Sequence, residues 1–479
     1  MMLIMKIQIK LFLISIFLTG ALFAQQQQIT VTGGKDVFHN INGESIDTVY
    51  GNVVITQGNV KITCDKAVRF VSQNKAELIG NVVATQDTLT ITCDHGYYFG
   101  DERKAESNSG VKLNDKKVIL TADSGDYFFD LDKAIFKHNV TLVDTSSILT
   151  SNELTYFKNE GKAIAVGNVK IVQSQNIIQA DSLTHFRESR ITFADNNVLI
   201  RNSANNTKIY GDHLEDYPKK YYSLIDKNPL LIQIDSSYIM QPDTSLIGKK
   251  DSVRTLKIDT LVIKSKRLEA YRDTMNIFKA EDSVEIVKGS FASKNDYSLY
   301  YRSLGKIVTF KINPVASQPI IWYENSQLTG DSIIIFMKNN KINLLNVNRN
   351  AFILSQNAMY RERFDQISGD TLRVYFNESG IRETDVHGKV YSIYYLYDDN
   401  SPNGLIKSSS QTAKIYFEDK KVSQVNLYGT PNSEYYPEIK VKGNELSFTL
   451  PDYVLYNNRP TKESLLSGST KYLESFNKK

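Results

Sequence analysis

Apolar positions return at a fixed interval along the first half of the chain. A polar residue recurs every 29 positions, and the other positions are counted from it. Three residues before it there is usually an Ile or Leu, and one residue before it a small residue. Five residues after it there is usually an aromatic residue, and seventeen after it a Val. The recurring polar residues are Asp36, Asp65, Asp94, Asp123, Asn152 and Asp181. A period of this length predicts a repeat protein in which each repeat is one supersecondary unit.

Each repeat contains two predicted strands. Residues 147–157 (SILTSNELTYF) and 162–173 (KAIAVGNVKIVQ) are separated by Asn159, Glu160 and Gly161, a composition typical of tight turns. Short turns require neighbouring strands to run antiparallel. Apolar and polar residues alternate over residues 134–142, so one face of that strand is expected to face a core.

The middle of each strand carries residues that disfavour a straight strand. Gly-Asn or Asn-Asn pairs interrupt one strand of most repeats, and the recurring Asp or Asn interrupts the other. The alternation also breaks two residues after the recurring residue, at Ala67, Leu154 and Leu183, which indicates a β-bulge. We therefore expect an all-β fold of stacked antiparallel strands, each bent once, that form two facing sheets with apolar side chains between them.

The repeat is less regular in the second half of the chain. Residues 218–260 contain Pro218, Pro229 and Pro242 and several polar clusters, which predicts a connector or an irregular insertion. Beyond it the recurring position is expected at intervals of 29 to 42 residues, at Lys266, Asn295, Asp331, Asp370, Thr412 and Asn444. The expected organisation is a repeat domain over 25–217, the connector, and a second, less regular repeat domain over 261–479.

The first 24 residues have the layout of a secretory signal peptide. Lys6 and Lys10 precede an apolar run over 11–23 that is too short for a spanning helix, and Ala24 provides a cleavage position. No cysteine follows Ala24, so a lipoprotein anchor is not expected, and no later segment is apolar enough to span a membrane as a helix. Export into an oxidising compartment is predicted.

Composition and charge narrow the classes of partner. The net charge is only +4 and basic residues are spread over the chain, so nucleic acid is not an expected partner. Cys64 and Cys93 occupy equivalent positions in successive repeats. In an antiparallel stack another strand separates them by about 9.6 Å, too far for a disulfide, whereas a parallel stack would make them neighbours. Free thiols that fill the small position are the favoured reading.

The repeated polar residues do not form the pattern of a catalytic or metal site. A catalytic pair of carboxylates is expected to break a repeat, whereas the Asp recurs in every unit, so a role in bending or turn bonding is favoured. The six histidines show no ligand spacing, and His138 stands on an apolar face at a position that is often Gly. Neither a metal nor a cofactor is predicted. Lys75, Lys104, Lys133 and Lys162 form a column that could meet phosphate groups, although solvated turn lysines are commoner.

Two segments carry a family resemblance. Residues 62–86 (ITCDKAVRFVSQNKAELIGNVVATQ) and 149–173 (LTSNELTYFKNEGKAIAVGNVKIVQ) share a succession of small residue and Asp or Asn, aromatic residue, turn, Lys-Ala and Gly-Asn-Val. This succession resembles the OstA-like family, which includes LptA and the periplasmic part of LptD. The resemblance implies an open, V-shaped β-jellyroll in the periplasm. It also implies a non-enzymatic role in which the interior carries lipid A acyl chains of lipopolysaccharide to the outer membrane.

The aligned apolar and aromatic columns are the predicted lipid-binding residues. Each CH₂ group of an acyl chain costs roughly 0.8 kcal/mol in water, so such a chain needs an apolar lining. The expected lining consists of Ile62, Phe70, Val82, Ile91, Phe99, Val111, Leu120, Phe128, Val140, Leu142, Leu149, Phe157, Val169 and Ile171. The unpaired strands at the two ends predict docking onto other lipopolysaccharide-transport proteins, or head-to-tail onto copies of the chain.

Two other functions fit the repeat. A structural envelope protein would have the same apolar columns sealed as a closed core. A carbohydrate-active enzyme on a β-solenoid would need a cleft with acidic residues that do not repeat, and the sequence offers none. Lipid that co-purifies with the chain would favour the carrier over both alternatives.

Overall fold

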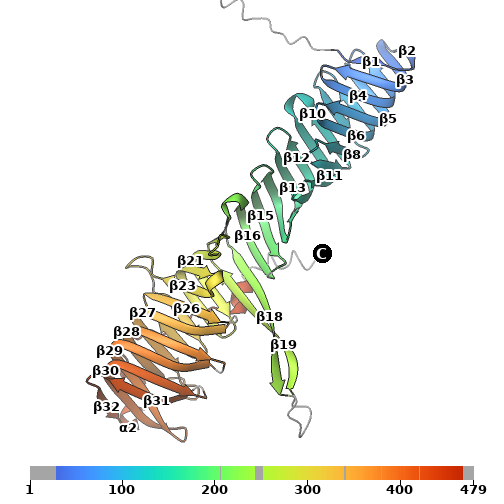
Figure 1. The fold of residues 1–479 in the computed structure, drawn as a ribbon. Coiled ribbons are helices and arrows are strands. Elements are labelled where there is room, and N and C mark those ends of the chain that lie inside the picture. The colour runs from blue at the N-terminus through green and yellow to red at the C-terminus, as the bar shows by residue number, and fades with distance from the viewer. Residues whose placement is uncertain are drawn as a thin grey trace, which may run out of the picture. The chain divides into compact units, whose positions relative to one another are not determined.

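The structure is a computed structural model. It describes residues 28–204, 206–242, 252–338, 341–378, 380–419 and 421–467, and side chains outside 235–257. The predicted signal peptide over 1–24 lies outside the described residues. The described chain is almost entirely antiparallel β and divides into two compact units, residues 1–163 and 164–479 (Figure 1). Within the described ranges, no helix has the length and apolar content that crossing a membrane requires.

The N-terminal unit is a stack of short and long strands. Its elements are β1 (Thr30–Thr32), β2 (Lys35–Ile41), β3 (Glu44–Gln57), β4 (Val60–Phe70), β5 (Lys75–Gln86), β6 (Leu89–Phe99), β7 (Lys104–Ser107), β8 (Val111–Asn114), β9 (Ile119–Ala122), β10 (Ser124–Phe128), the 3₁₀ turn η1 (Phe129–Leu131), β11 (Lys133–Val143) and β12 (Ile148–Phe157). The border between the two units falls within β13 (Lys162–Gln173).

Strands that follow one another in the chain pair antiparallel, as the short turns predict. β3 pairs with β4, β4 with β5 and β5 with β6, all in antiparallel register. Farther along, one strand is divided into β7 and β8, which both pair with β6, and the next into β9 and β10, which both pair with β11. The antiparallel arrangement is therefore confirmed.

Each long strand bends where the sequence places Gly, Asn and the recurring Asp. Between β5 and β6 the register jumps from Ile79↔His95 to Val82↔Cys93, so Gly80 and Asn81 lie opposite Asp94 alone. Gly80 and Asn81 have φ angles of 75° and 46°, a left-handed conformation that Gly and Asn tolerate best. The Asn81 side chain also donates a hydrogen bond of 2.8 Å to the Asp65 carboxylate on the other neighbouring strand. The recurring Asp thus has the bending role that the sequence favoured.

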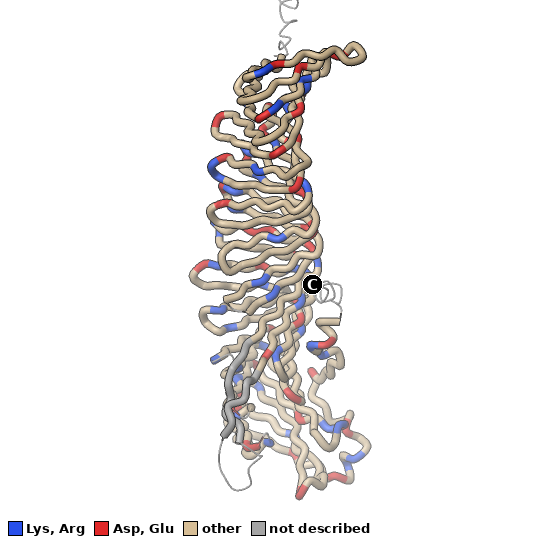
Figure 2. Tube along the Cα trace, turned by 90° about the vertical axis from the view of Figure 1, so that its right-hand side faces the viewer, with Lys and Arg blue, Asp and Glu red and all other residues tan. Residues whose placement is uncertain are grey.

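The bends fold the strands into two half-sheets that face each other. Half-sheet 1 contains 53–57, 60–64, 82–86, 89–93, 111–114, 119–122, 140–143 and 148–151. Half-sheet 2 contains 44–50, 66–70, 75–79, 95–99, 104–107, 124–128, 133–137 and 153–157. We call the line of bends the crease and the opposite side, where the hairpin turns of both half-sheets lie, the mouth. Figure 2 shows the folded-over course of the chain, with basic and acidic residues interspersed along each unit.

The C-terminal unit repeats the same strand pattern with longer members. Its strands are β14 (Asn176–Phe186), β15 (Ile191–Asn202), β16 (Thr207–Tyr217), β17 (Tyr222–Asp226), β18 (Leu230–Pro242), β19 (Ser252–Lys264), β20 (Arg267–Tyr271), β21 (Ile277–Lys288), β22 (Phe291–Tyr301), β23 (Lys306–Phe310), β24 (Ile320–Tyr323), β25 (Ser326–Thr329), β26 (Ser332–Lys338), β27 (Lys341–Gln356), β28 (Phe364–Asn377), β29 (Gly380–Asp398), β30 (Ser401–Glu418), β31 (Lys421–Tyr428) and β32 (Asn432–Tyr436). Two 3₁₀ turns, η2 (Pro218–Lys220) and η3 (Arg302–Leu304), lie between strands.

Three of the six positions predicted for the second half, Lys266, Asp331 and Asp370, lie at bends. Two are displaced by one residue, and the last, Asn444, lies outside the strands. Asp370 is skipped where β27 pairs with β28, as expected. The residue skipped between β21 and β22 is Asp296 rather than Asn295. Between β29 and β30 it is Gln411 rather than Thr412. The irregular spacing of this half left the register open to an error of one position.

The predicted connector contains strands. β16 pairs with both β17 and β18, and β17 pairs in turn with β20, so residues 222–226 and 230–242 are parts of the sheet. None of the three prolines stands inside a strand: Pro218 begins η2, Pro229 precedes β18 and Pro242 is the last residue of β18. The described residues of segment 218–260 are thus largely strand, and the domain borders drawn from the sequence stay a prediction.

The last described residues, 437–467, contain no strand, and we call them the strap. They contain α2 (Glu438–Val441), η4 (Glu445–Ser447) and α3 (Lys462–Ser467). The sequence predicted a final repeat at Val441, Gly443 and Asn444, which is wrong because Val441 belongs to α2. The strap packs on an apolar face of the unit, where Val441 and Leu450 contact Phe352 and Leu354 of β27.

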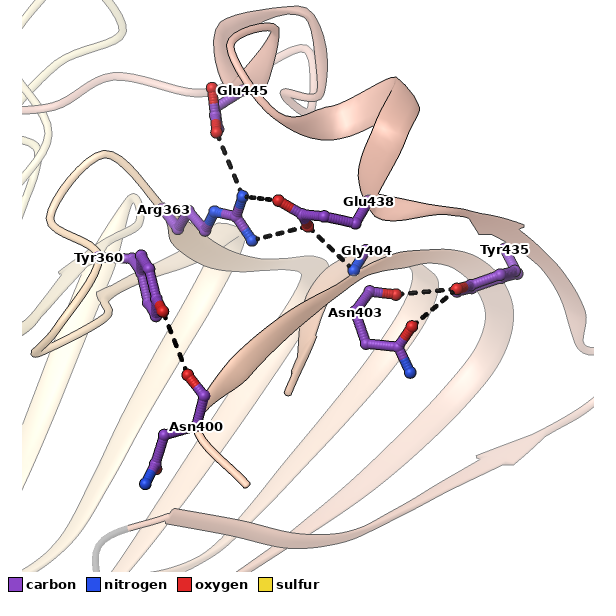
Figure 3. Close-up of polar contacts among 8 residues, drawn as sticks. All are labelled: Tyr360, Arg363, Asn400, Asn403, Gly404, Tyr435, Glu438 and Glu445. Carbon is purple, nitrogen blue, oxygen red and sulfur yellow. Dashed lines mark hydrogen bonds and ion pairs between the residues drawn. The ribbon is translucent and has the colours of Figure 1, made fainter. Parts of the chain in front are cut away.

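Side chains of the sheet hold the strap by its backbone. The Gln366 amide donates to Phe448 O at 3.1 Å and accepts from Leu450 N at 2.8 Å. Gln327 makes the same pair of bonds to Val454 O and Tyr456 N, at 2.8 and 2.9 Å. Near the start of the strap, the buried Arg363 binds Glu438 with both terminal nitrogens and also reaches Glu445 (Figure 3). The strap is thus fastened at several points along its length.

Candidate functional site

Most of the predicted lining residues face the interior between the half-sheets. Their side chains are buried, with exposed fractions between 0 and 7% for Ile62, Val82, Ile91, Val111, Leu120, Val140, Leu142 and Leu149 in the N-terminal unit and for Val169 and Ile171 in the C-terminal unit. They come from successive strands, so the N-terminal unit has an apolar interior that extends over its whole stack. Their role in lipid binding stays a prediction.

The four predicted phenylalanines lie on the outside instead. Phe70, Phe99, Phe128 and Phe157 are half-buried, and lysine ammonium groups lie over their rings at 4.5 to 6.0 Å from the centroids. The reason is the bulge: one skipped residue in the first strand of each repeat reverses the alternation of its two faces. The aromatic side chain that faces inward stands one residue earlier, at Tyr98, Tyr127 and Tyr156, all at most 1% exposed.

The lysine column has partners on this outer surface. Lys75 lies 4.4 Å from the Tyr97 ring centroid and 5.0 Å from that of Phe99. Lys104 also forms an ion pair of 3.3 Å with Glu106. These lysines therefore pack on aromatic rings and carboxylates of the sheet, and their position favours the structural reading over a phosphate site.

The interior of the N-terminal unit is closed. A cavity of about 20 Å³ lies between the half-sheets, lined by Val82, Ile91 and Val111 on one side and by Tyr127 and Phe136 on the other. A space of this size holds about one water molecule. The structure therefore has the sealed interior that the closed-core alternative expects, and an acyl chain can enter only if the half-sheets separate.

A row of polar contacts closes the mouth. Gln57, at the end of β3 in half-sheet 1, is 4% exposed. Its amide donates to Gly100 O at 3.0 Å, and its carbonyl accepts from the hydroxyl of Tyr98 in half-sheet 2 at 2.5 Å. Two repeats on, the buried Asp115 accepts a hydrogen bond of 2.7 Å from the Tyr156 hydroxyl. Each of these bonds joins one half-sheet to the other, and we call the row the seam.

The middle repeat of the seam is incomplete. The Gln86 amide donates to Phe129 O across the mouth at 3.4 Å and to Asn59 at 3.3 Å. The tyrosine of this repeat, Tyr127, donates instead to Asp132 in its own half-sheet. The Gln86 side-chain oxygen has no hydrogen-bond partner among the described residues, although Gln86 is only 7% exposed. A buried acceptor without a donor costs about 1–3 kcal/mol, so this is the weakest point of the seam.

Comparison with known proteins identifies the region that contains the crease and the seam. Residues 36–181 match the family described as OstA-like protein. This part of the chain is OstA-like. The OstA-like region includes β3 to β12 and therefore every residue of the seam. A search of curated proteins returned no match.

Solved structures give a weaker comparison. The chain is similar to a structure described as LptH, the LptA homologous periplasmic component of the lipopolysaccharide transport device from Pseudomonas aeruginosa, with 12% identity. The similarity covers 36% of this chain and 85% of LptH, with a TM-score of 0.12. At that score the match carries no argument about the OstA-like region.

Sequence reasoning missed the seam, although the signal is visible. Gln57, Gln86 and Asp115 stand 29 residues apart, always 21 residues after the recurring Asp of the OstA-like repeat. These residues stand at the ends of apolar strands, where a polar residue ordinarily indicates the start of a turn. The tyrosine partners of Gln57 and Asp115 follow 41 residues later, and no local pattern links positions so far apart.

The Tyr98 hydroxyl of the seam remains a hydrogen-bond donor over the ordinary pH range. Burial raises the pKa of Tyr98 to about 12. Burial and the nearby Asp132 carboxylate also raise the pKa of Tyr127 well above its usual value. The protonated Tyr98 hydroxyl donates to Gln57, so this bond of the seam does not depend on moderate changes of pH.

Other candidate chemistry in the OstA-like region is limited. Cys64 and Cys93 are free thiols on strands separated by β5, as the antiparallel prediction requires, and burial raises the pKa of both. His138 is exposed at the crease with a φ angle of 62°, so the expectation that it stands on an apolar face is wrong. No group of three or more His, Cys, Asp or Glu in the described ranges is placed to hold a metal ion.

Proposed function

We propose that the chain is a periplasmic lipopolysaccharide-transport protein that shields lipid A acyl chains between the half-sheets of its N-terminal unit on the way to the outer membrane. The observation that carries the proposal is the OstA-like match over the region whose interior is continuously apolar.

The energies favour uptake into the closed interior. A chain of about a dozen carbons gains about 10 kcal/mol on leaving water, at roughly 0.8 kcal/mol per CH₂. Opening the mouth breaks the hydrogen bonds of Gln57, Gln86 and Asp115 across it, each of which contributes about 1 kcal/mol net. The apolar walls exchange contacts with each other for contacts with the acyl chain. Burial of one chain therefore exceeds the cost of opening.

The open sheet edges support docking as the second part of the function. Among the described strands, β1 and β2 pair with β3 alone, and β31 and β32 pair with β30 alone. Unpaired backbone groups on such strands accept a strand from another chain. We propose that these edges join transport partners or further copies of the chain.

Photo-crosslinking tests the proposal with a matched pair of phenylalanines. Phe136 faces the interior and is 1% exposed, whereas Phe128 is half-buried on the outer face of half-sheet 2. Each is replaced in the full chain by p-benzoylphenylalanine, and the protein is irradiated with purified lipopolysaccharide. Capture at position 136 without capture at position 128 is expected.

Three results would contradict the carrier role. Equal capture at both positions would mean surface adhesion. No capture at position 136 at saturating lipopolysaccharide would favour the closed-core structural protein. Turnover of a glycan would favour an enzyme, although the antiparallel stack is unlike the parallel coils of a β-solenoid.

A further inference from the structure

The crease and the mouth hold the half-sheets together by different means. At the crease the strands run on from one half-sheet into the other, and Asp–Asn hydrogen bonds such as Asp65–Asn81 join neighbouring strands. At the mouth the described contacts between the half-sheets use side chains, as in Gln57–Tyr98 and Asp115–Tyr156. If the half-sheets separate at the mouth, no pairing between strands is lost. At the crease they cannot separate, because the backbone itself connects them there.

We propose that the seam is the entry gate of the interior, and that the side-chain oxygen of Gln86 binds a hydroxyl or amide donor in the head group of an entering acylated amphiphile. This inference rests on the proposed function, because a gate requires that the interior takes up acyl chains. It adds the route of entry and a polar subsite to that function.

The unpaired oxygen of Gln86 indicates the polar subsite. The Gln86 amide nitrogen faces two acceptors, Asn59 Oδ1 and Phe129 O, so its orientation is fixed and the oxygen cannot take the place of the nitrogen. The oxygen is left without a donor because Tyr127 turns to Asp132. A ligand that supplies a donor here removes an existing deficit and displaces no protein partner.

The cavity lies beside the same repeat. Tyr127 and Phe136 line it, and Tyr127 is the tyrosine that corresponds to Gln86 in the 29-residue period. Its lining also includes Val82, Cys93 and Gly125 next to the bends but not Gln86, so the cavity lies on the crease side of the interior and Gln86 at the mouth. An acyl chain that enters at the mouth therefore leaves its polar end at Gln86 and extends between the half-sheets in the direction of the cavity.

Loosening the seam tests the gate. The variants Tyr98→Phe and Tyr156→Phe each remove one hydroxyl that crosses the mouth, and Tyr50→Phe removes the hydroxyl of an exposed tyrosine on the outer surface. The rate at which p-benzoylphenylalanine at position 136 captures lipopolysaccharide should rise about five-fold for each seam variant, the factor for one net hydrogen bond. It should not change for Tyr50→Phe. Seam variants that behave like Tyr50→Phe would overturn the gate.

Locking the seam gives the opposite test. Gln57→Cys and Gly100→Cys, in a Cys64→Ala and Cys93→Ala background, are bridged by a bis-maleimide that carries a reducible disulfide. Capture should fall at least ten-fold and return after reduction. A control pair, Lys61→Cys and Thr85→Cys, bridges neighbouring strands of half-sheet 1 and should leave capture unchanged. Undiminished capture by the locked protein would contradict entry through the mouth.

Competition tests the polar subsite. Dodecanamide and methyl dodecanoate have comparable chains, but the amide alone has a hydrogen-bond donor in its head. The amide should compete with lipopolysaccharide about five-fold better than the ester, and Gln86→Leu should abolish the difference. Equal competition by both in the unaltered chain would refute the subsite.

These results separate the inference from the proposed function. Absence of capture at position 136 in the unaltered chain refutes the carrier itself. Capture with no response to the seam variants, the lock or the head group leaves the carrier in place and refutes the gate and the subsite.

Discussion

Individual residues with left-handed backbone conformations decide where each strand bends. Asn81 and Asn139 have φ angles of 46° and 50°, which most side chains adopt only with strain. Each also donates a hydrogen bond to a recurring Asp, at 2.8 Å to Asp65 and at 2.7 Å to Asp123. One residue type therefore supplies both the conformation and the bond that the crease requires.

Substitution of Asn139 should separate these two contributions. Asn139→Ala places a β-carbon in the left-handed region and removes the bond, so we expect a loss of about 1–2 kcal/mol of unfolding free energy. Asn139→Gly keeps the conformation and loses only an exposed bond, so its loss should be less than half as large. Urea unfolding followed by circular dichroism measures both. Equal losses would mean that the backbone conformation is not the determining factor.

A single buried carboxylate should make stability depend on pH. Asp47 is 5% exposed, and burial together with the nearby Asp36 carboxylate raises its pKa to about 6. In the unfolded chain the ordinary pKa is about 3.9. The folded state therefore binds the proton of Asp47 more tightly than the unfolded chain does. Protonated Asp47 contributes stability below about pH 4, and this contribution is lost as the pH rises to about 6.

The Asp47→Asn variant removes this dependence. Its unfolding free energy relative to the unaltered chain should rise between pH 4 and pH 6 by up to about 3 kcal/mol, the equivalent of a two-unit shift, and then stay constant. Thermal or urea unfolding at a series of pH values measures the difference. A difference that is flat over this range would show that Asp47 ionises normally in the folded chain.

At the scale of elements, the strap depends on a few side chains that replace strand pairing. It adds no strand to the sheet, and Gln366 and Gln327 each bind its backbone through a donor and an acceptor. Arg363 is only 2% exposed and fixes α2 through Glu438. Such an element should detach when these few side-chain contacts are removed, whereas a strand of the sheet is held by backbone hydrogen bonds along its whole length.

Arg363→Ala should therefore release the beginning of the strap. Removal of one partner from a buried ion pair costs about 3–5 kcal/mol, because Glu438 and Glu445 lose their cation. Trypsin should then cleave after Lys440 and Lys442 much faster, and amide exchange should increase over 437–450. Arg382→Ala, which removes a side chain that is 57% exposed, serves as the control. Unchanged cleavage in Arg363→Ala would show that the apolar contacts hold the strap by themselves.

At the scale of the whole molecule, the strands at the edges of the sheet are the surfaces most prone to associate with other chains. β2 pairs with β3 alone among the described strands and exposes Phe38 and Ile41, at 69% and 53%. An apolar strand with a free edge favours pairing with another chain. The proposed docking of the chain to transport partners or to further copies should therefore depend on β2.

Charged residues on this edge should weaken association. Analytical ultracentrifugation should show concentration-dependent assembly of the unaltered chain and a large loss of it in Phe38→Lys with Ile41→Lys, because lysine opposes strand addition. Ile119→Lys with Val143→Lys adds the same number of charges at positions that are 41% and 37% exposed on β9 and β11, which have paired strands on both sides, and should leave assembly unchanged. Equal effects of the two changes would indicate a general effect of charge instead of edge pairing.

The sequence by itself determined the period, the antiparallel strands and most of the creases in the first half. These features are local: alternation marks a strand, a short turn reverses it, and Gly or Asn marks a left-handed bend. The recurring Asp and Gly80-Asn81 were therefore recognised for the right reason. The first crease was placed at Asp36, which instead pairs with Val49, and the bend lies at Gly33 and Gly34. In the second half, Asn295 and Thr412 were chosen in place of Asp296 and Gln411, because irregular spacing removes the repeat as a guide.

Only the tertiary structure decided which side chains face inward beyond each bend and what closes the mouth. One skipped residue turned Phe70 and its equivalents outward and Tyr98 inward, and a change of face leaves the composition of the strand unaltered. The seam joins Gln57 to Tyr98 and Asp115 to Tyr156, partners that are 41 residues apart and become neighbours only when the half-sheets close. A local sequence pattern predicts the backbone conformation of one strand, whereas these contacts depend on how the two half-sheets pack against each other.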